Sequence, residues 1–195
     1  MKPWNISIND LCRVCRRKKH TGSLIVVVGI IFATLMIGLS HTWWMVKATE
    51  QEMRDNLLER TKMVAKAINI ENLETLSGNR SDLVKPEYQR LKNQLIILKE
   101  ANPDIRFIYL MGTRSDGSVF FFIDNEPLGS PDYTDPGSPY PEATAELKNA
   151  LNNWTEIVTG PDTDRWGTWM SSIVPLRDHL TGKAKAGLGA DIAAT

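Results

Sequence analysis

The stretch GPDTDRWGTWMSSIVPLRDHLTGK, residues 160–183, brings together acidic, basic and aromatic side chains that can bind a small molecule. The Arg165 guanidinium can bind a ligand carboxylate through two parallel hydrogen bonds. Trp166 and Trp169 can stack on a ligand or bind a cation over their ring faces. Asp162 and Asp164 can hold a divalent cation, although carboxylates at this spacing more commonly cap a turn. The stretch therefore suggests either a binding site or a hairpin with a heavy core.

Catalytic and metal-binding patterns are missing from the sequence. The three histidines, His20, His41 and His179, lie in an N-terminal tail, an apolar segment and a hairpin turn, so we expect no metal site or catalytic dyad. No phosphate-binding loop and no Gly-x-Ser-x-Gly elbow occurs. We therefore expect no enzyme activity and no cofactor.

The N-terminal part of the chain predicts a membrane anchor. Residues 1–22 form a tail with six basic residues and one acidic residue, and the next 23 residues, 24–46, contain no charged side chain. At about 1.5 Å per residue this apolar run crosses a bilayer core of about 30 Å. We predict a membrane helix over residues 23–46, with the basic tail on the cytoplasmic side of the inner membrane. A buried soluble helix and a cleaved signal peptide are the alternatives.

The remaining residues, 47–195, form an extracytoplasmic domain in this interpretation. They carry 17 basic and 22 acidic residues, and this acidic balance argues against a nucleic-acid partner. Apolar spacing predicts a stalk helix over residues 47–70, a short helix at 71–76, a helix from Pro86 and another over 143–151. Runs of β-branched and aromatic residues predict five strands, at residues 105–112, 119–123, 154–159, 166–176 and 184–192. The fold class is α+β, with a five-stranded antiparallel sheet.

The fourth predicted strand is apolar on both faces, so both faces of the sheet need a cover. Strict alternation places Trp166 on one face and Trp169 on the other. The helices cover one side, and the proline-rich segment 127–141, with Tyr133 and Tyr140, is the candidate cover for the second. A pocket between loop and sheet, lined by aromatic and a few polar groups, is typical of small-ligand sites.

The chain after the anchored stalk resembles the extracytoplasmic Cache (PDC) sensor domains. Two segments carry this resemblance, FIYLMGTRSDGSVFFFID and GPDTDRWGTWMSSIVPLRDHLTGKAKAGLGADI. These PAS-like modules occur on bacterial histidine kinases, diguanylate cyclases and chemoreceptors. The resemblance covers residues 47–192. It implies a five-stranded antiparallel sheet behind a long N-terminal helix, a pocket on the opposite sheet face, and a receptor of the sensor histidine kinase type.

The resemblance also implies a set of ligand-binding residues: Tyr109, Asp124, Tyr133, Arg165, Trp166, Trp169 and Asp191. The expected ligand is an amino acid or an organic acid. Each residue has a structural alternative. The two tryptophans can be core residues, Asp191 can cap the last strand, and Arg165 can pair with Asp162 or Asp164.

Two further expectations concern assembly. The stalk helix carries a stripe of apolar residues spaced as in a coiled-coil seam: Met53, Leu57, Val64 and Ile68. This stripe predicts a homodimer through the stalk helix, unless a monomer buries the stripe on its own sheet.

The 195 residues hold no second membrane helix and no kinase or cyclase motif, so we expect a receptor fragment, a truncated product or a stand-alone sensor. The alternative function is a membrane-anchored structural or protein-interaction module without a small-molecule ligand.

Overall fold

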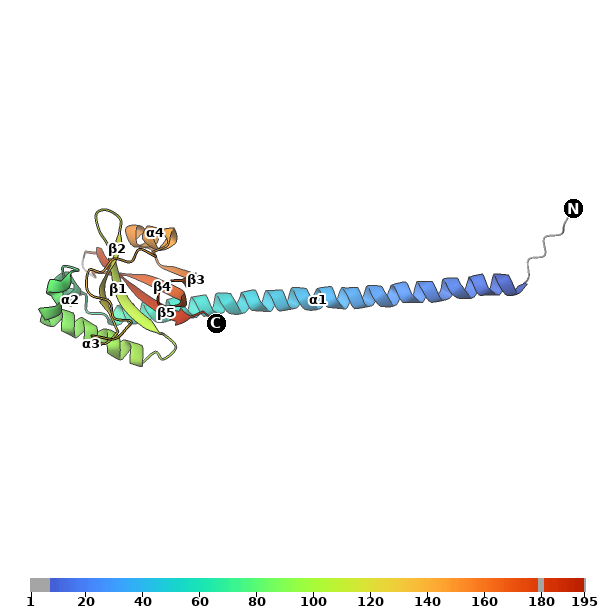
Figure 1. Cartoon of the computed structure of the whole chain (residues 1–195), viewed down its shortest axis with the longest axis horizontal. Helices are drawn as coiled ribbons and strands as arrows, with labels where there is room; N and C mark the ends of the chain where they lie inside the picture. The colour runs from blue at the N-terminus through green and yellow to red at the C-terminus, as the bar shows by residue number, and fades with distance from the viewer. Residues whose placement is uncertain (1–7, 179–180, 195) are drawn as a thin grey trace. The chain divides into compact units, whose positions relative to one another are not determined.

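The computed structural model describes residues 8–178 and 181–194, with side chains from residue 23 onward. The basic tail's first seven residues and His179 therefore lie outside the described part. The chain divides into two compact units, Met1–Gln51 and Glu52–Thr195. Helix α1 (Ile8–Ala67) contributes to both units, and all other elements belong to the second (Figure 1).

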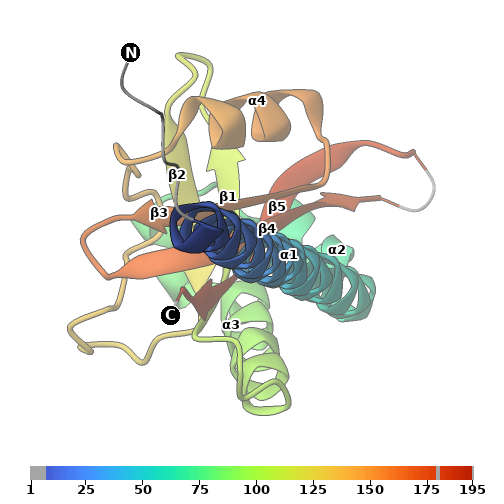
Figure 2. The same ribbon diagram turned by 90° about the vertical axis from the view of Figure 1, so that its right-hand side faces the viewer.

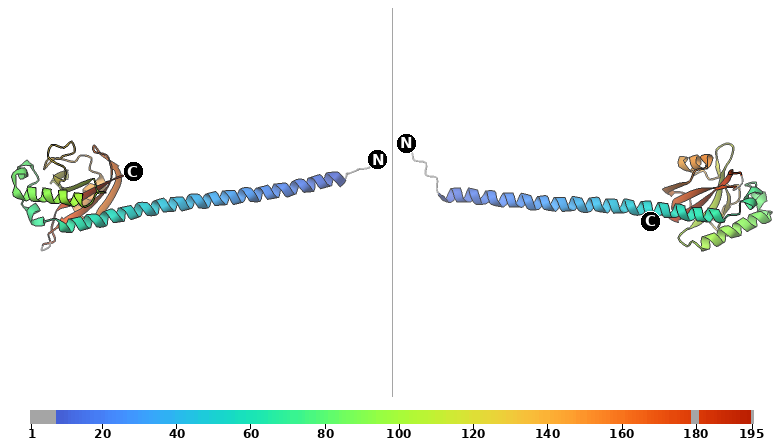
Figure 3. Two further views of the ribbon diagram at one scale, coloured as in Figure 1. Left: turned by 90° about the horizontal axis from the view of Figure 1, so that it is seen from below. Right: turned by 180° about the vertical axis from the view of Figure 1, so that it is seen from behind.

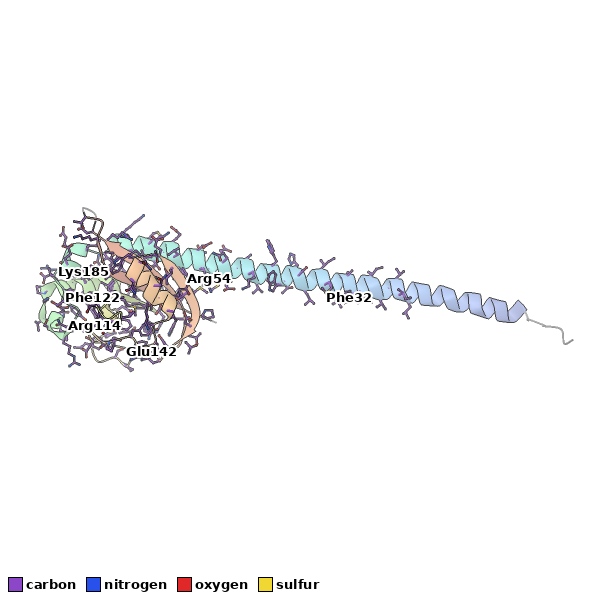
Figure 4. The ribbon with its side chains drawn as sticks, turned by 90° about the horizontal axis from the view of Figure 1, so that it is seen from above. Phe32, Arg54, Arg114, Phe122, Glu142 and Lys185 are labelled. Carbon is purple, nitrogen blue, oxygen red and sulfur yellow. The ribbon has the colours of Figure 1, made fainter. Side chains whose placement is uncertain are left out.

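In the first unit, α1 carries the apolar segment that the sequence predicts as a membrane span. By length and composition this helix can cross a bilayer, with a mean hydropathy of 2.5 over its most apolar window and none of that window buried. Its large apolar side chains are exposed, for example Phe32, labelled in Figure 4, and the neighbouring pair Trp43 and Trp44. A soluble helix would bury such a surface, so this exposure fits a lipid environment.

The second unit is built on a five-stranded antiparallel sheet in the order β2-β1-β5-β4-β3. The strands are β1 (Phe107–Thr113), β2 (Val119–Asp124), β3 (Ile157–Thr163), β4 (Thr168–Arg177) and β5 (Ala184–Ala193). The predicted α+β class, with its long N-terminal helix and five antiparallel strands, is confirmed.

Helices cover one face of this sheet. Besides the end of α1, these are α2 (Ile70–Glu74), the 3-10 helix η1 (Arg80–Val84) and α3 (Pro86–Glu100), which begins with proline at the position that helices favour. Figure 3 shows α2 and α3 together on one side of this unit. Leu91 and Leu95 of α3 pack with Ile108 and Leu110 of β1 in the main core.

The stalk stripe lies in that same core. Leu57, Val64 and Ile68 are at most 4% exposed and pack with the sheet, while Met53 is 41% exposed. Three of the four stripe residues are therefore buried on the domain's own sheet, as the alternative expected. Leu57, Val64 and Ile68 have no free surface for a dimer seam, and a homodimer through the stalk helix stays a prediction.

The opposite sheet face has a thinner cover, made by α4 (Ala145–Asn153) and the long segment 125–144. Figure 2 shows α4 and α3 on opposite sides of the sheet. Thr144 caps α4, its hydroxyl accepting from the Leu147 amide at 3.1 Å. Part of the long segment pairs with β2, since the Gly137 amide donates to the Phe121 carbonyl at 2.7 Å. The segment is therefore an ordered second cover.

Candidate functional site

A cavity of about 130 Å³ lies between this second cover and the sheet. Every strand contributes to its wall, as do α4 and the long segment. A volume of this size holds several water molecules or a small organic molecule. The predicted pocket on the face away from the N-terminal helix is thus present in the structure.

Aromatic rings make up much of the wall. Six of them line the cavity: Phe107, Tyr109, Phe121, Tyr140, Trp166 and Trp169. Phe107 packs edge-on against Trp169, with ring centroids 5.1 Å apart, and Phe121 contacts Tyr140 and Trp166 in the same way. Edge-to-face packing of this kind fixes the rings relative to one another. The wall is therefore preformed.

Glycine in β5 makes room for one of these rings. Gly189 pairs with Tyr109 in the sheet, and a Cβ atom on it would lie 2.0 Å from the Tyr109 ring. The ring consequently occupies the space that a side chain at Gly189 would fill. Its hydroxyl reaches Asp191, two residues further along the same face, and donates to Oδ1 at 2.9 Å.

Asp191 is a buried carboxyl group that faces the cavity and has no cationic partner among the described residues. It is 6% exposed. Burial raises its pKa to about 7, although hydrogen bonds from Ser171 and Tyr109 oppose the rise and the nearby Asp164 adds to it. The same burial, with the neighbouring Asp191, raises the pKa of Tyr109 well above its usual value.

Six more carboxyl groups line the cavity, which makes seven in all; the others belong to Asp124, Glu126, Asp132, Glu142, Asp162 and Asp164. No Lys, Arg or His side chain among the described residues joins them in the wall. This acidic lining is the cavity's main electrostatic feature.

Asp124, at the end of β2, is held from the opposite side of the domain. Lys92 of α3 donates to its Oδ1 at 2.6 Å, and the Thr134 amide donates to Oδ2 at 2.5 Å. Both charged side chains are buried, Lys92 at 8% and Asp124 at 6% exposure. Burial raises the pKa of Asp124, while the bond from Lys92 acts to lower it. This ion pair fastens the long segment to α3.

Asp164 organises the turn between β3 and β4. Its Oδ1 accepts from the Trp166 and Gly167 amides at 2.9 and 3.1 Å and from the Trp169 indole at 3.0 Å. Its Oδ2 accepts from the Tyr140 hydroxyl at 2.9 Å. The carboxylate therefore caps the turn, as the alternative to a cation site expected.

The same turn explains where the two tryptophans lie. Trp166 is in the turn and β4 begins at Thr168, so strand alternation does not separate the two rings and both line the cavity. The expectation that they occupy opposite sheet faces is wrong. Neither is fully buried, and both also pack on neighbouring rings.

Arg165 lies outside the cavity wall. Its guanidinium binds Glu142 through Nε at 2.8 Å and Nη2 at 2.6 Å, and it also covers the Trp166 ring at 4.7 Å. The expected alternative pairing with Asp162 or Asp164 does not occur, since the partner is Glu142 of the long segment, labelled in Figure 4. The hydrogen bonds from Arg165 lower the pKa of Glu142.

Of the residues expected from the sequence, five line the cavity: Tyr109, Asp124, Trp166, Trp169 and Asp191. Tyr133 is placed instead beside α3, with Lys92 Nζ 4.7 Å from its ring centroid. Sequence reasoning missed Phe107, Phe121, Ser171 and Thr159. Period-two alternation from Tyr109 points to Phe107, whereas no local signal identifies Thr159.

No protein-family model matches the chain, and no curated protein shows significant sequence similarity. Solved structures of Campylobacter jejuni chemoreceptor Tlp3 do resemble it. Its ligand-binding domain in complex with 4-methylisoleucine shows 16% identity and a TM-score of 0.47, covering 75% of this chain and 53% of that one. The complex with L-valine shows 16% identity, a TM-score of 0.35 and coverage of 75% and 62%.

This chain thus spans less than two thirds of those solved chains. Their TM-scores lie below 0.5, so the function proposed below depends on the cavity of this chain itself. The similar structures belong to a chemoreceptor, one of the receptor classes that the sequence resemblance named.

Proposed function

We propose that residues 47–195 form the extracytoplasmic ligand-sensing domain of a membrane-bound signalling receptor, anchored through residues 23–46. The observation that carries this proposal is the cavity: an aromatic wall around a buried carboxyl group, Asp191, that no cation among the described residues neutralises. A protein interior that served packing alone would fill such a space with its own side chains.

The cavity also has a physical route to α1. Thr159 of β3 lines the cavity, and the carbonyl groups on either side of it accept hydrogen bonds from Arg54 of α1. The Arg54 guanidinium lies 3.3 Å from the Val158 oxygen and 2.5 Å from the Gly160 oxygen. A ligand that moves β3 therefore acts on α1, provided that it binds the two positions of β3 with different affinity.

The type of signalling domain that the receptor controls is a separate expectation. The histidine kinase type, which the sequence resemblance predicts, stays a prediction. Sequencing of the gene beyond the codon for Thr195 tests it, because a kinase core in frame would support it and a chemotaxis signalling module would replace it.

The sensing function is tested by thermal unfolding of the full chain in detergent micelles against amino acids, amines and organic acids. A compound at 100 times its Kd stabilises the domain by about 2.7 kcal/mol, which raises Tm by several degrees. Asp191→Asn should abolish that shift. The control Glu100→Gln, an exposed charge at the end of α3, should keep it. If no compound changes Tm, the interaction-module alternative replaces the sensor.

A further inference from the structure

We propose that the ligand of this cavity is a small organic amine without a carboxylate group, bound as its ammonium cation with Asp191 as the counter-ion. The inference rests on the proposed sensing function and names its ligand class. It replaces the ligand expected from the sequence, an amino acid or an organic acid, because both of those carry a carboxylate group.

The first argument is that each cation beside the cavity is already neutralised. Lys92 is held by Asp124 at 2.6 Å. Arg106 is held by two carboxylates, with Nη1 2.6 Å from Glu126 and Nη2 2.6 Å from Asp132. These are charge-assisted pairs at short distance, so a ligand carboxylate would have to break one of them to gain a partner.

Arg165, another described cation beside the cavity, is also paired with a carboxylate. The Nε and Nη2 edge of its guanidinium group binds the Glu142 carboxylate, which itself lines the cavity. A ligand carboxylate beside Glu142 would meet a like charge, and the Nε and Nη2 donors of Arg165 are already used by Glu142. Such an arrangement rejects anions, and specificity is often built from rejection of this kind.

The second argument is that Asp191 lacks the cation that the other buried carboxylates of the wall have. Asp124 has Lys92 and Glu126 has Arg106, whereas the hydrogen bonds given to Asp191 come from Tyr109 and Ser171. A buried carboxylate is costly unless a cation neutralises it. An ammonium group in the cavity supplies that charge.

The third argument concerns what surrounds an ammonium group at this position. Ser171 and Thr159 line the cavity and offer hydroxyl oxygens as acceptors. Tyr109, Trp166 and Trp169 offer ring faces, which attract a cation through their quadrupole. The polar and the apolar parts of an alkylamine or arylalkylamine thus both find complementary surface.

Two sets of matched compounds test the ligand class. Each keeps one carbon skeleton and varies only the charged groups: 3-methylbutylamine, L-leucine and 4-methylpentanoate, then 2-phenylethylamine, L-phenylalanine and 3-phenylpropanoate. Binding to the full chain in micelles is measured by isothermal titration calorimetry at pH 8. We expect the better amine to bind at least tenfold more tightly than its amino acid, and the carboxylates not to bind.

The outcomes separate the two proposals. If an amino acid or a carboxylate binds more tightly than its matched amine, the amine inference is overturned while the sensing function stands. If none of the six compounds binds and the wider library also fails to raise Tm, the sensing function itself fails.

Substitution at Asp191 supplies a second readout. Asp191→Asn should weaken amine binding at least 100-fold, and Asp191→Glu, which keeps the charge, should recover part of it. Amine binding should also weaken as the pH falls below about 7, where Asp191 gains a proton. Among the described residues, the titratable groups that interact with Asp191 are Tyr109, Tyr140 and Asp164. Equal binding to Asp191→Asn and wild type would overturn the inference.

Discussion

Removing the buried charge of Asp191 should stabilise the empty domain while it abolishes ligand binding. Asparagine has nearly the same shape as aspartic acid, and its amide can still accept the hydrogen bond from the Tyr109 hydroxyl. The substitution therefore removes the negative charge of the buried carboxylate and keeps the shape of the side chain. Asp191→Asn thus separates the cost of the buried carboxylate from its shape.

The size and the sign of this effect follow from the pKa. Asp191 has a pKa of about 7 in the folded domain, against 3.8 for an unperturbed aspartic acid. Between these values the folded state binds more protons than the unfolded state, so stability falls as the pH rises from about 4 to about 7. The loss from this single group reaches about 4 kcal/mol at pH 8, and about 2 kcal/mol of it is already present at pH 5.

Urea unfolding of the full chain in micelles, followed by tryptophan fluorescence, measures the effect at pH 5 and pH 8. Asp191→Asn should be more stable than wild type at both, by a margin that widens by about 2–3 kcal/mol at the higher pH. Glu100→Gln should match wild type to within about 0.5 kcal/mol, since its side chain is exposed. A margin that does not change with pH, or a less stable Asp191→Asn at pH 8, would refute the reasoning.

The remaining predictions concern the wall and its supports. Gly189→Ala should destabilise the domain by about 1–3 kcal/mol in urea unfolding and weaken amine binding, because the new methyl group displaces the Tyr109 ring. Lys92→Met should cost about 3–5 kcal/mol, since it strands the buried Asp124, and the added change Asp124→Leu should restore most of that loss. Arg165→Met should lower stability by at most about 1 kcal/mol and change amine affinity less than tenfold, because its partner Glu142 is a solvent-accessible residue; a 100-fold loss would return Arg165 to the role of ligand anchor.

The sheet and its helices could be predicted from the sequence because their signals are local. Alternation and β-branched runs located the five strands to within a few residues, and Pro86 marked the start of α3. The same alternation gave the wrong sheet face for Trp166. The Asp164 side chain caps a turn there, so β4 begins only after Trp166. Strand periodicity carries no information about such a cap.

The charges of the site could not be predicted, since they depend on pairs that are distant in sequence. Lys92 and Asp124 meet across the end of β2, and Arg165 meets Glu142 across the cavity rim. Sequence reasoning therefore treated Arg165 as available for a ligand carboxylate and listed Asp191 beside Asp124 without distinguishing their charges. The three-dimensional pairing distinguishes Asp191: of the buried carboxyl groups of the wall, it is the one that receives neither a cation nor a backbone amide from the described residues.

The central claim, that the cavity holds a small ligand beside Asp191, is tested most directly by a crystal structure of the full chain with the compound that raises Tm most. We expect its electron density between the sheet and the long segment, with an ammonium nitrogen within hydrogen-bonding distance of the Asp191 carboxylate. Density for that compound at another surface, with the cavity filled by the chain's own side chains, would contradict the claim.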